Sequence, residues 1–244
     1  MRDLPPPLPP AERTVGQLVA ETIRGYGERF WRALPLGLPL ALAYLLIGGH
    51  SIDAQIAILC ALGPLFGAAY VYACSLVLEP RVSLRRTAVA GTVSLLVWLP
   101  APLGLRAYVL PMLAWLSLFG LAVPAVLVEG LGARAALARG VKLAAADYVH
   151  AFLALAALLL VVLLSAGVLS ALLHGQAENA RRVASALALL VLSPLLYLGG
   201  ALLYVDQAAR LGSRRPNRRR RRDADLHPPL DADPAGGADA QVEP

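Results

Sequence analysis

The chain has 244 residues, of which 58% are hydrophobic and only 16% are charged, and its mean hydropathy is +0.63. Soluble globular domains are about 45–50% apolar and about 25% charged, so this composition excludes an ordinary soluble domain, as well as collagen-like and wholly disordered chains. The formal net charge is +6 at pH 7. Because the charged residues are also very unevenly distributed, the sequence predicts a multi-pass membrane protein.

The N-terminal residues 1–13 form a proline-rich lead that contains a run of extended, polyproline-type sequence, and we expect them to be disordered. They do not resemble a cleavable signal peptide. Five arginines precede the first apolar stretch, and no short apolar core with a small-residue cleavage site occurs. The first apolar stretch is therefore expected to act as an uncleaved anchor.

Residues 14–32 show the periodicity of an amphipathic helix. Apolar side chains recur every three or four positions from Val15 to Phe30, and Thr14 and Gln17 have the spacing of a capping box. This pattern predicts an interfacial helix on the cytoplasmic membrane surface that ends in aromatic residues at the headgroups. A helix packed on the protein's own cytoplasmic base is the alternative, and the sequence does not decide between the two.

The transmembrane domain is predicted over residues 33–210. About 20 helical residues, at about 1.5 Å rise each, cross a hydrocarbon core of about 30 Å. Alternating polar and apolar decapeptides typical of β-barrels do not occur, so we expect an all-α membrane protein with six transmembrane helices in three hairpins. The alternative, a soluble protein with buried helices, would need six such runs in succession. The stretches without Asp, Glu, Lys or Arg are 33–52, 54–78, 87–105, 107–128, 148–177 and 183–205.

Prolines interrupt most of these stretches. Pro35, Pro39 and Pro111 fall in or near a first helical turn, where the missing N–H costs little. Pro64 and Pro194 lie in mid-span, and we expect each to kink its helix and to free backbone carbonyls that need another partner. Such kinks either line a substrate path or only shape the packing.

The basic residues predict the orientation. All but three of the 22 lie on one face of the predicted bundle, and the exceptions are Arg106, Arg181 and Arg182. By the positive-inside rule, the arginine-rich face and both termini are cytoplasmic. The connection 129–147 belongs to this face and is long enough for a second interfacial helix. The connections on the other face are short, which argues against an external ligand-binding domain.

Residues 211–244 are predicted to form a disordered cytoplasmic tail that is first basic and then acidic. We expect its arginines to contact anionic lipid headgroups. No accompanying fold or aromatic platform indicates nucleic-acid binding. The arginines concerned are Arg214, Arg215, Arg218, Arg219, Arg220, Arg221 and Arg222.

Five ionisable residues at predicted cytoplasmic span ends form a candidate polar cluster. His150 follows Asp147 by three residues on one helical face, which suits either a proton-handling pair or an interfacial hydrogen bond. We expect two further pairs, Glu129 with Arg134 and Asp206 with Arg210, and structural pairing outweighs a functional role for them. The cluster consists of Glu129, Asp147, His150, Asp206 and Arg210.

Other chemical motifs do not stand out. The four histidines and two cysteines lack metal-ligand spacing, and no nucleotide-binding loop or nucleophile motif occurs. The sequence therefore predicts no cofactor, no metal and no catalytic residue. Cys60 and Cys74, fourteen residues apart in one predicted span, would lie about 21 Å apart and beyond disulfide reach.

Three segments carry a resemblance to known proteins. They are residues 15–31, Pro124 with residues 129–143, and residues 194–210. They resemble a bacterial family of membrane-domain proteins related to the membrane region of glycerophosphodiester phosphodiesterases. The resemblance implies a six-helix bundle with both ends inside and, for most members, no assigned activity.

The sequence also departs from the pattern of that family. Gly140 replaces the usual serine after the arginine, and Asp206 and Arg210 stand four apart. The family's soluble phosphodiesterase domain, with its His-Arg-Gly type motif, does not occur in these 244 residues. Diesterase activity is therefore not expected.

The leading hypothesis is a non-enzymatic scaffold or accessory subunit of a bacterial cytoplasmic membrane. One lysine against 21 arginines indicates a GC-rich, bacterial genome. Its expected partners are the lipid bilayer and either further copies of the chain or another membrane protein. A transporter or permease subunit that moves a small solute or lipid is the alternative, although the hydrophobic-x-Leu-Pro ending of an importer coupling loop is missing after Lys142. A lipid-modifying enzyme would need the polar cluster to converge on a cytoplasmic pocket.

Overall fold

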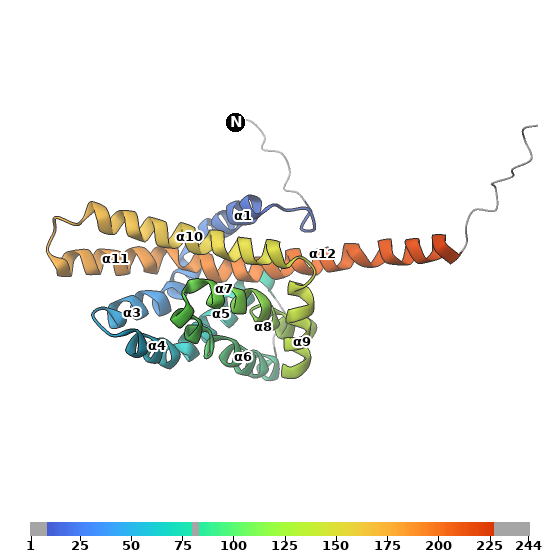
Figure 1. Ribbon diagram of the computed structural model, residues 1–244, viewed down its shortest axis with the longest axis horizontal. Coiled ribbons are helices and arrows are strands. Elements are labelled where there is room, and N and C mark those ends of the chain that lie inside the picture. Colours follow the sequence, from blue (N-terminus) through green and yellow to red (C-terminus); the bar gives the residue numbers. More distant parts are fainter. Residues whose placement is uncertain (1–8, 80–82, 227–244) are drawn as a thin grey trace, which may run out of the picture.

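A computed structural model describes residues 9–79 and 83–226 of the chain, with side chains described as far as Ser213. This part of the chain is mostly helical and contains no strand, which confirms the all-α prediction. Most of the predicted proline-rich lead (residues 1–8) and the end of the tail (residues 227–244) lie outside the described residues. Figure 1 shows α11 and α12 following one another along the length of the bundle, with α10 beside them and the end of α12 projecting beyond the other helices.

The helices follow one another with short connections. The first half of the chain contains α1 (Val15–Glu28), α2 (Phe30–Ala33), η1 (Leu34–Gly37), α3 (Leu38–Ile47), α4 (Ile52–Ala61), α5 (Gly63–Leu78) and α6 (Leu84–Trp98). The second half contains η2 (Ala101–Ala107), α7 (Val109–Phe119), α8 (Ala122–Glu129), α9 (Ala133–Ala144), α10 (Tyr148–Leu172), α11 (Glu178–Leu192) and α12 (Pro194–Leu226).

The described residues contain five helical segments that are long and apolar enough to cross a membrane, or six if α4 and α5 form one bent span. Their positions match the six predicted stretches, so the prediction of several apolar, membrane-compatible helices is confirmed. The surface of α10 agrees with it, because large apolar side chains such as Leu160, Leu164 and Leu172 are more than half exposed. Apolar groups in such numbers on an outer face need an apolar surrounding.

The helices are not arranged only as sequential hairpins. α12 packs against α5, α10 and α1, while α3 packs against α11 as well as against α4. The buried core has two parts, one around α5, α6 and α8 and one between α1, α10 and α12. α12 therefore joins segments from both halves of the sequence.

The amphipathic helix at the N-terminus is confirmed in its start and corrected in its end. Thr14 and Gln17 form the predicted capping box, and α1 ends at Glu28 before a separate turn, α2. Its apolar side packs on α10 and α12, with Leu18 fully buried. The structure thus favours the alternative in which this helix covers the protein's own base.

The two mid-span prolines interrupt helices in different ways. Pro64 lies at the start of α5, which is bent by 50° from α4, so the predicted kink is confirmed. Pro194 begins α12 after a break at Ser193, yet α11 and α12 continue as one span of 36 residues, Glu178–Ser213. Pro194 has no N–H for the carbonyl of Leu190, and this carbonyl, which lacks its helical partner, lies against Gly37.

A neighbouring carbonyl at the Pro194 break also finds a partner outside its own helix. The Tyr26 hydroxyl of α1 donates to the Val191 carbonyl oxygen at 2.6 Å. Burial raises the pKa of this tyrosine, which keeps it in the protonated form that donates. The predicted need for a new carbonyl partner is therefore met by the N-terminal helix.

The structure describes a helix over the first part of the predicted disordered tail, and the disorder of residues 227–244 stays a prediction. α12 extends to Leu226, well past residue 210, where the tail was expected to begin. A run of like charges suggested disorder, but arginine is a good helix former and the helix is already nucleated by the apolar residues before it.

Candidate functional site

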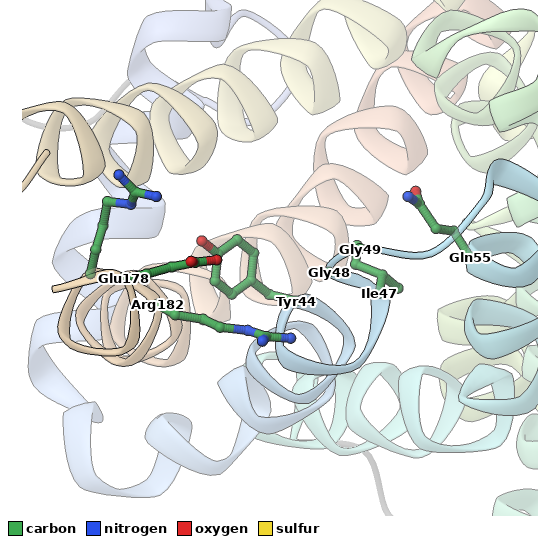
Figure 2. A pocket seen from close by; sticks show the side chains of 8 residues that line it. Tyr44, Ile47, Gly48, Gly49, Gln55, Glu178 and Arg182 are labelled. Carbon is green, nitrogen blue, oxygen red and sulfur yellow. The ribbon is translucent and has the colours of Figure 1, made fainter.

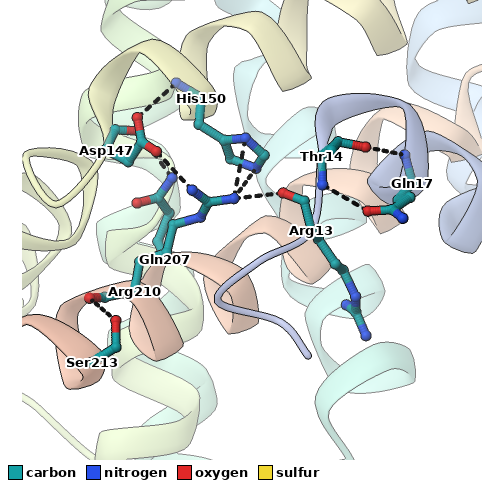
Figure 3. A network of polar contacts seen from close by, with 8 residues as sticks. All are labelled: Arg13, Thr14, Gln17, Asp147, His150, Gln207, Arg210 and Ser213. Carbon is teal, nitrogen blue, oxygen red and sulfur yellow. Dashed lines mark hydrogen bonds and ion pairs between the residues drawn. The ribbon is translucent and has the colours of Figure 1, made fainter. Parts of the chain in front are cut away.

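Six polar residues from three parts of the chain meet at one end of the bundle, and we call them the Arg13 network; Figure 3 shows all of them except Asp206. They come from the segment before α1, from the start of α10 and from the middle of α12. The six are Arg13, Asp147, His150, Asp206, Gln207 and Arg210.

Local structure explains how these side chains are positioned. Asp206 and Arg210 are four residues apart on α12 and therefore face the same side of the helix. Asp147 is the N-cap of α10, where its carboxylate accepts a hydrogen bond from the backbone N–H of His150 at 3.1 Å. Arg13 directly precedes the capping residue Thr14, so the start of α1 fixes its backbone.

Ion pairs and hydrogen bonds join the three parts. Arg13 donates to the Asp206 carboxylate at 3.1 Å, and Arg210 donates to the Asp147 carboxylate at 2.7 Å. A second guanidinium nitrogen of Arg210 donates to the Arg13 carbonyl oxygen at 2.5 Å and lies 3.4 Å from His150 Nδ1. Gln207 donates to the Asp147 carbonyl oxygen at 3.1 Å.

The network is partly buried and its formal charges balance. The Asp206 side chain is fully buried and the Arg13 side chain is 13% exposed, whereas the Asp147 side chain is 30% exposed. Two guanidinium groups face two carboxylates, which offsets the cost of removing each charge from water. Asp206 Oδ2 and Gln207 Oε1 have no hydrogen-bond partner among the described residues. Buried acceptors of this kind are commonly satisfied by ordered water.

Glu129 does not belong to the network, and its predicted partner was wrong. It accepts two bonds from Arg139 at 2.8 and 2.9 Å, and the Tyr204 hydroxyl donates to it at 3.0 Å. Arg134, the expected partner, lies five residues before Arg139 on α9, which places the two side chains about 140° apart around the helix. Only Arg139 faces the end of α8.

The predicted pair of Asp206 with Arg210 was also wrong, since Asp206 binds Arg13 and Arg210 binds Asp147. The other predicted members do come together: Asp147, His150, Asp206 and Arg210 lie in one cluster. Sequence reasoning missed Arg13 and Gln207. Arg13 is separated from its partner by 193 residues, so no local pattern indicates the contact.

The predicted lipid-contact arginines lie on the projecting part of α12, and their side chains are outside the described residues. They are Arg214, Arg215, Arg218, Arg219, Arg220, Arg221 and Arg222. The described part of the chain holds no group of three or more His, Cys, Asp or Glu side chains that would suit a metal ion.

The bundle contains an apolar cavity of about 360 Å³ between its helices, which is partly open at the surface. An aromatic group forms part of its wall: Trp98 stacks on Phe66 with ring centroids 5.5 Å apart, lies edge-on to Tyr70 and is tilted against Tyr197. Leucine side chains from α10, α11 and α12 line much of the remainder. The cavity therefore offers shape and apolar contact rather than charge.

The ionisable side chains and the apolar cavity thus lie in different parts of the bundle. The ionisable groups at one end bind one another, while the cavity between the helices is apolar. No family model, no curated protein and no solved structure matches the chain. The resemblance to the membrane region of glycerophosphodiester phosphodiesterases accordingly stays a prediction.

Proposed function

We propose that this chain is a multi-pass protein of a bacterial cytoplasmic membrane and acts as a non-enzymatic scaffold or accessory subunit. It has six spans in three hairpins, both termini are cytoplasmic, and anionic lipid headgroups contact its C-terminal arginines. Further copies or another membrane protein bind to it. The resemblance quoted from the sequence remains part of this proposal, without diesterase activity.

One observation carries the proposal: the ionisable groups that an enzyme or an ion-coupled carrier would need are engaged with one another in the Arg13 network. Arg210 directs its guanidinium at Asp147 and at the Arg13 carbonyl, and Arg13 directs its own at Asp206. The charges link the N-terminal segment to α10 and α12. This is the arrangement expected of a structural base.

The location of the charges supports the orientation. The turns between α3 and α4 and between α10 and α11 lie toward one end of the bundle, and α9 and the projecting part of α12 lie toward the other (Figure 1). The arginine-rich segments belong to the second end. The positive-inside rule assigns that end to the cytoplasm.

Cysteine labelling tests the orientation. In a variant without Cys60 and Cys74, Gln176→Cys and Arg134→Cys each place one exposed thiol at opposite ends of the bundle. A membrane-impermeant maleimide should label Gln176→Cys in right-side-out vesicles and Arg134→Cys only in inverted vesicles. The reverse pattern, or labelling of both in one type of vesicle, would contradict the topology.

A transporter subunit for a small solute or lipid is the second candidate, and the apolar cavity is the observation that favours it. The cavity is bordered by Phe66, just after the Pro64 bend, and by Leu196, just after Pro194. A charged thiol reagent separates the two functions. Ala43 lies in the wall of the cavity. In a scaffold without water in the cavity, the thiol of Ala43→Cys should not react with the reagent. A reaction as rapid as that of Gln176→Cys, the exposed control, would favour an aqueous path.

Quantitative mass spectrometry of the protein purified in mild detergent addresses the accessory role. A scaffold should retain a membrane protein in fixed ratio, or a second copy of itself. An energy-coupling ATPase at fixed ratio would instead identify a permease subunit and overturn the scaffold.

A further inference from the structure

A second pocket, at the end of the bundle opposite the Arg13 network, adjoins the apolar cavity. It has a volume of about 360 Å³ and lies between the end of α3, the start of α4 and the start of α11 (Figure 2). Tyr44 and Ile47 line both spaces, so the pocket and the cavity are neighbours across these two side chains. The polar lining of the pocket consists of Tyr44, Gln55, Glu178, Arg181 and Arg182.

Arg182 is held in the pocket by the backbone of α3. Its guanidinium donates to the Leu45 carbonyl oxygen at 2.5 Å and lies beside Gly48, where a Cβ atom would be only 2.9 Å from it. Figure 2 shows Arg182 and Glu178 extending from α11 and Tyr44 extending from α3. The remaining guanidinium donors of Arg182 are left for another acceptor.

Two further charges in the pocket have no ionic partner. Among the described residues, the ion pairs involve neither Arg181 nor Glu178, although the two are three residues apart on α11. The pocket thus presents two guanidinium groups and one carboxylate. A ligand that complements them carries an anionic group with several acceptor oxygens and, a few atoms away, a cation.

The adjoining cavity requires that the ligand also has an apolar part. Its volume falls within the range of about 300–1,000 Å³ that is usual for small-molecule sites. Trp98 borders it, and the indole N–H of this residue is buried without an acceptor among the described residues. An ester carbonyl placed between a headgroup and an acyl chain would supply that acceptor.

We propose that the pocket and the cavity together bind one glycerophospholipid with an amine headgroup, of the phosphatidylethanolamine type. The phosphate lies between Arg181 and Arg182, the ammonium faces Glu178, and one acyl chain occupies the apolar cavity. Under the topology proposed above, on which this inference rests, the lipid comes from the outer leaflet.

The headgroup contacts, rather than the acyl chain, are expected to decide which lipid binds. An acyl chain is already in an apolar surrounding within the bilayer, so the cavity gives shape selection rather than a hydrophobic driving force. Arginine–phosphate contacts are charge-assisted and strengthen at the membrane interface, where water is scarce. Loss of one such contact is expected to weaken binding about tenfold.

Native mass spectrometry of the purified, delipidated protein tests the site. The protein is mixed with equimolar dioleoyl-phosphatidylethanolamine and dioleoyl-phosphatidylglycerol in detergent, and lipid adducts are counted. We expect the ethanolamine lipid to be preferred, Arg181→Gln to reduce both adducts about tenfold, and Glu178→Gln to abolish the preference. Arg134→Gln, an exposed arginine at the other end of the bundle, is the matched control and should behave as the unaltered protein.

Two further arms separate the parts of the proposal. Ala43→Leu fills the cavity and should reduce adduct formation while the thermal stability of the delipidated protein is retained. Soluble phosphoethanolamine should not displace the lipid, because it lacks the acyl chain. Displacement by it would overturn the role of the cavity, and equal adducts in Arg181→Gln and the control would overturn the site. Labelling of Gln176→Cys and Arg134→Cys reports the topology independently, so the failure of one proposal is distinguishable from the failure of the other.

Discussion

Among the glycines of the described residues, Gly37 has the least room for a side chain. A Cβ atom built there would lie 1.8 Å from the carbonyl oxygen of Leu190 on α11, whereas ordinary van der Waals contacts begin at 3.4 Å. Gly37→Ala therefore requires η1 and α11 to separate by about 1.6 Å. The atoms that a side chain at Gly37 would meet are backbone atoms of Leu190, close to Pro194. No flexible side chain can therefore move aside to make room.

The expected cost follows from that displacement. Over-packing of a tight contact costs about 1–3 kcal/mol, and a shift of this size also breaks the long hydrogen bond of 3.5 Å from the Ser193 hydroxyl to the Gly37 carbonyl oxygen. For a chain of this length, about 1 kcal/mol corresponds to about 2–4 °C in melting temperature. We expect Gly37→Ala to melt about 2–12 °C below the unaltered protein.

Gly91→Ala is the matched control. Gly91 lies inside α6, and a Cβ atom there meets nothing within 4 Å. Alanine is favoured over glycine in a helix by about 0.5–1 kcal/mol, so this variant should melt at the same temperature or slightly higher. The assay is the loss of the monodisperse peak in size-exclusion chromatography after heating in detergent. Equal melting temperatures for Gly37→Ala and Gly91→Ala would refute the close approach of η1 to α11.

Three further variants test the polar contacts. Arg210→Leu removes the cation that binds the Asp147 carboxylate and the Arg13 carbonyl. We expect the free energy of unfolding to fall by about 2–3 kcal/mol and trypsin to cleave faster after Arg13, as detected by N-terminal sequencing. An unchanged cleavage rate would speak against the network. Tyr26→Phe should cost about 1 kcal/mol in a chemical unfolding titration. Burial raises the pKa of Tyr26 above its ordinary value of 10.0. The contribution of its hydroxyl to stability is therefore complete below pH 10 and declines as the pH rises further. If Tyr26→Phe and the unaltered protein lost stability in the same way at alkaline pH, this reasoning would be contradicted. Glu129→Gln should cost no more than about 1 kcal/mol, because the ion pair it breaks is about a quarter exposed and Tyr204 still has an acceptor; a loss above 3 kcal/mol would show that this pair is more important than its exposure implies.

Much of the fold was predictable because single helices obey local rules. The uncharged stretches gave the helical spans, and the spacing of Thr14 and Gln17 gave the start of α1. Pro64 gave the position of the 50° bend. In each case the determining residues lie within a few turns of one another.

The candidate site was predictable only in part. Asp147 and His150 are neighbours on one helix, and their interaction follows from their spacing. The partners of Asp206 and Glu129 depend on which helices pack together, and the nearest arginine in sequence was the wrong choice for both. The apolar cavity and the adjoining pocket likewise arise from the packing of α3 on α11, which no periodicity indicates.

The contact of Arg13 with Asp206 also bears on how the chain is made. The two residues are separated by 193 positions, so the ribosome has to add almost the whole protein before the contact is available. At about 5–20 residues per second, that delay is about 10–40 s. During most of this interval the first helix has its capping box but lacks α10, and α12 follows only at its end, so the surroundings in which Leu18 is buried are incomplete. Docking of the N-terminal helix is therefore among the last steps of assembly, after the final span has been inserted.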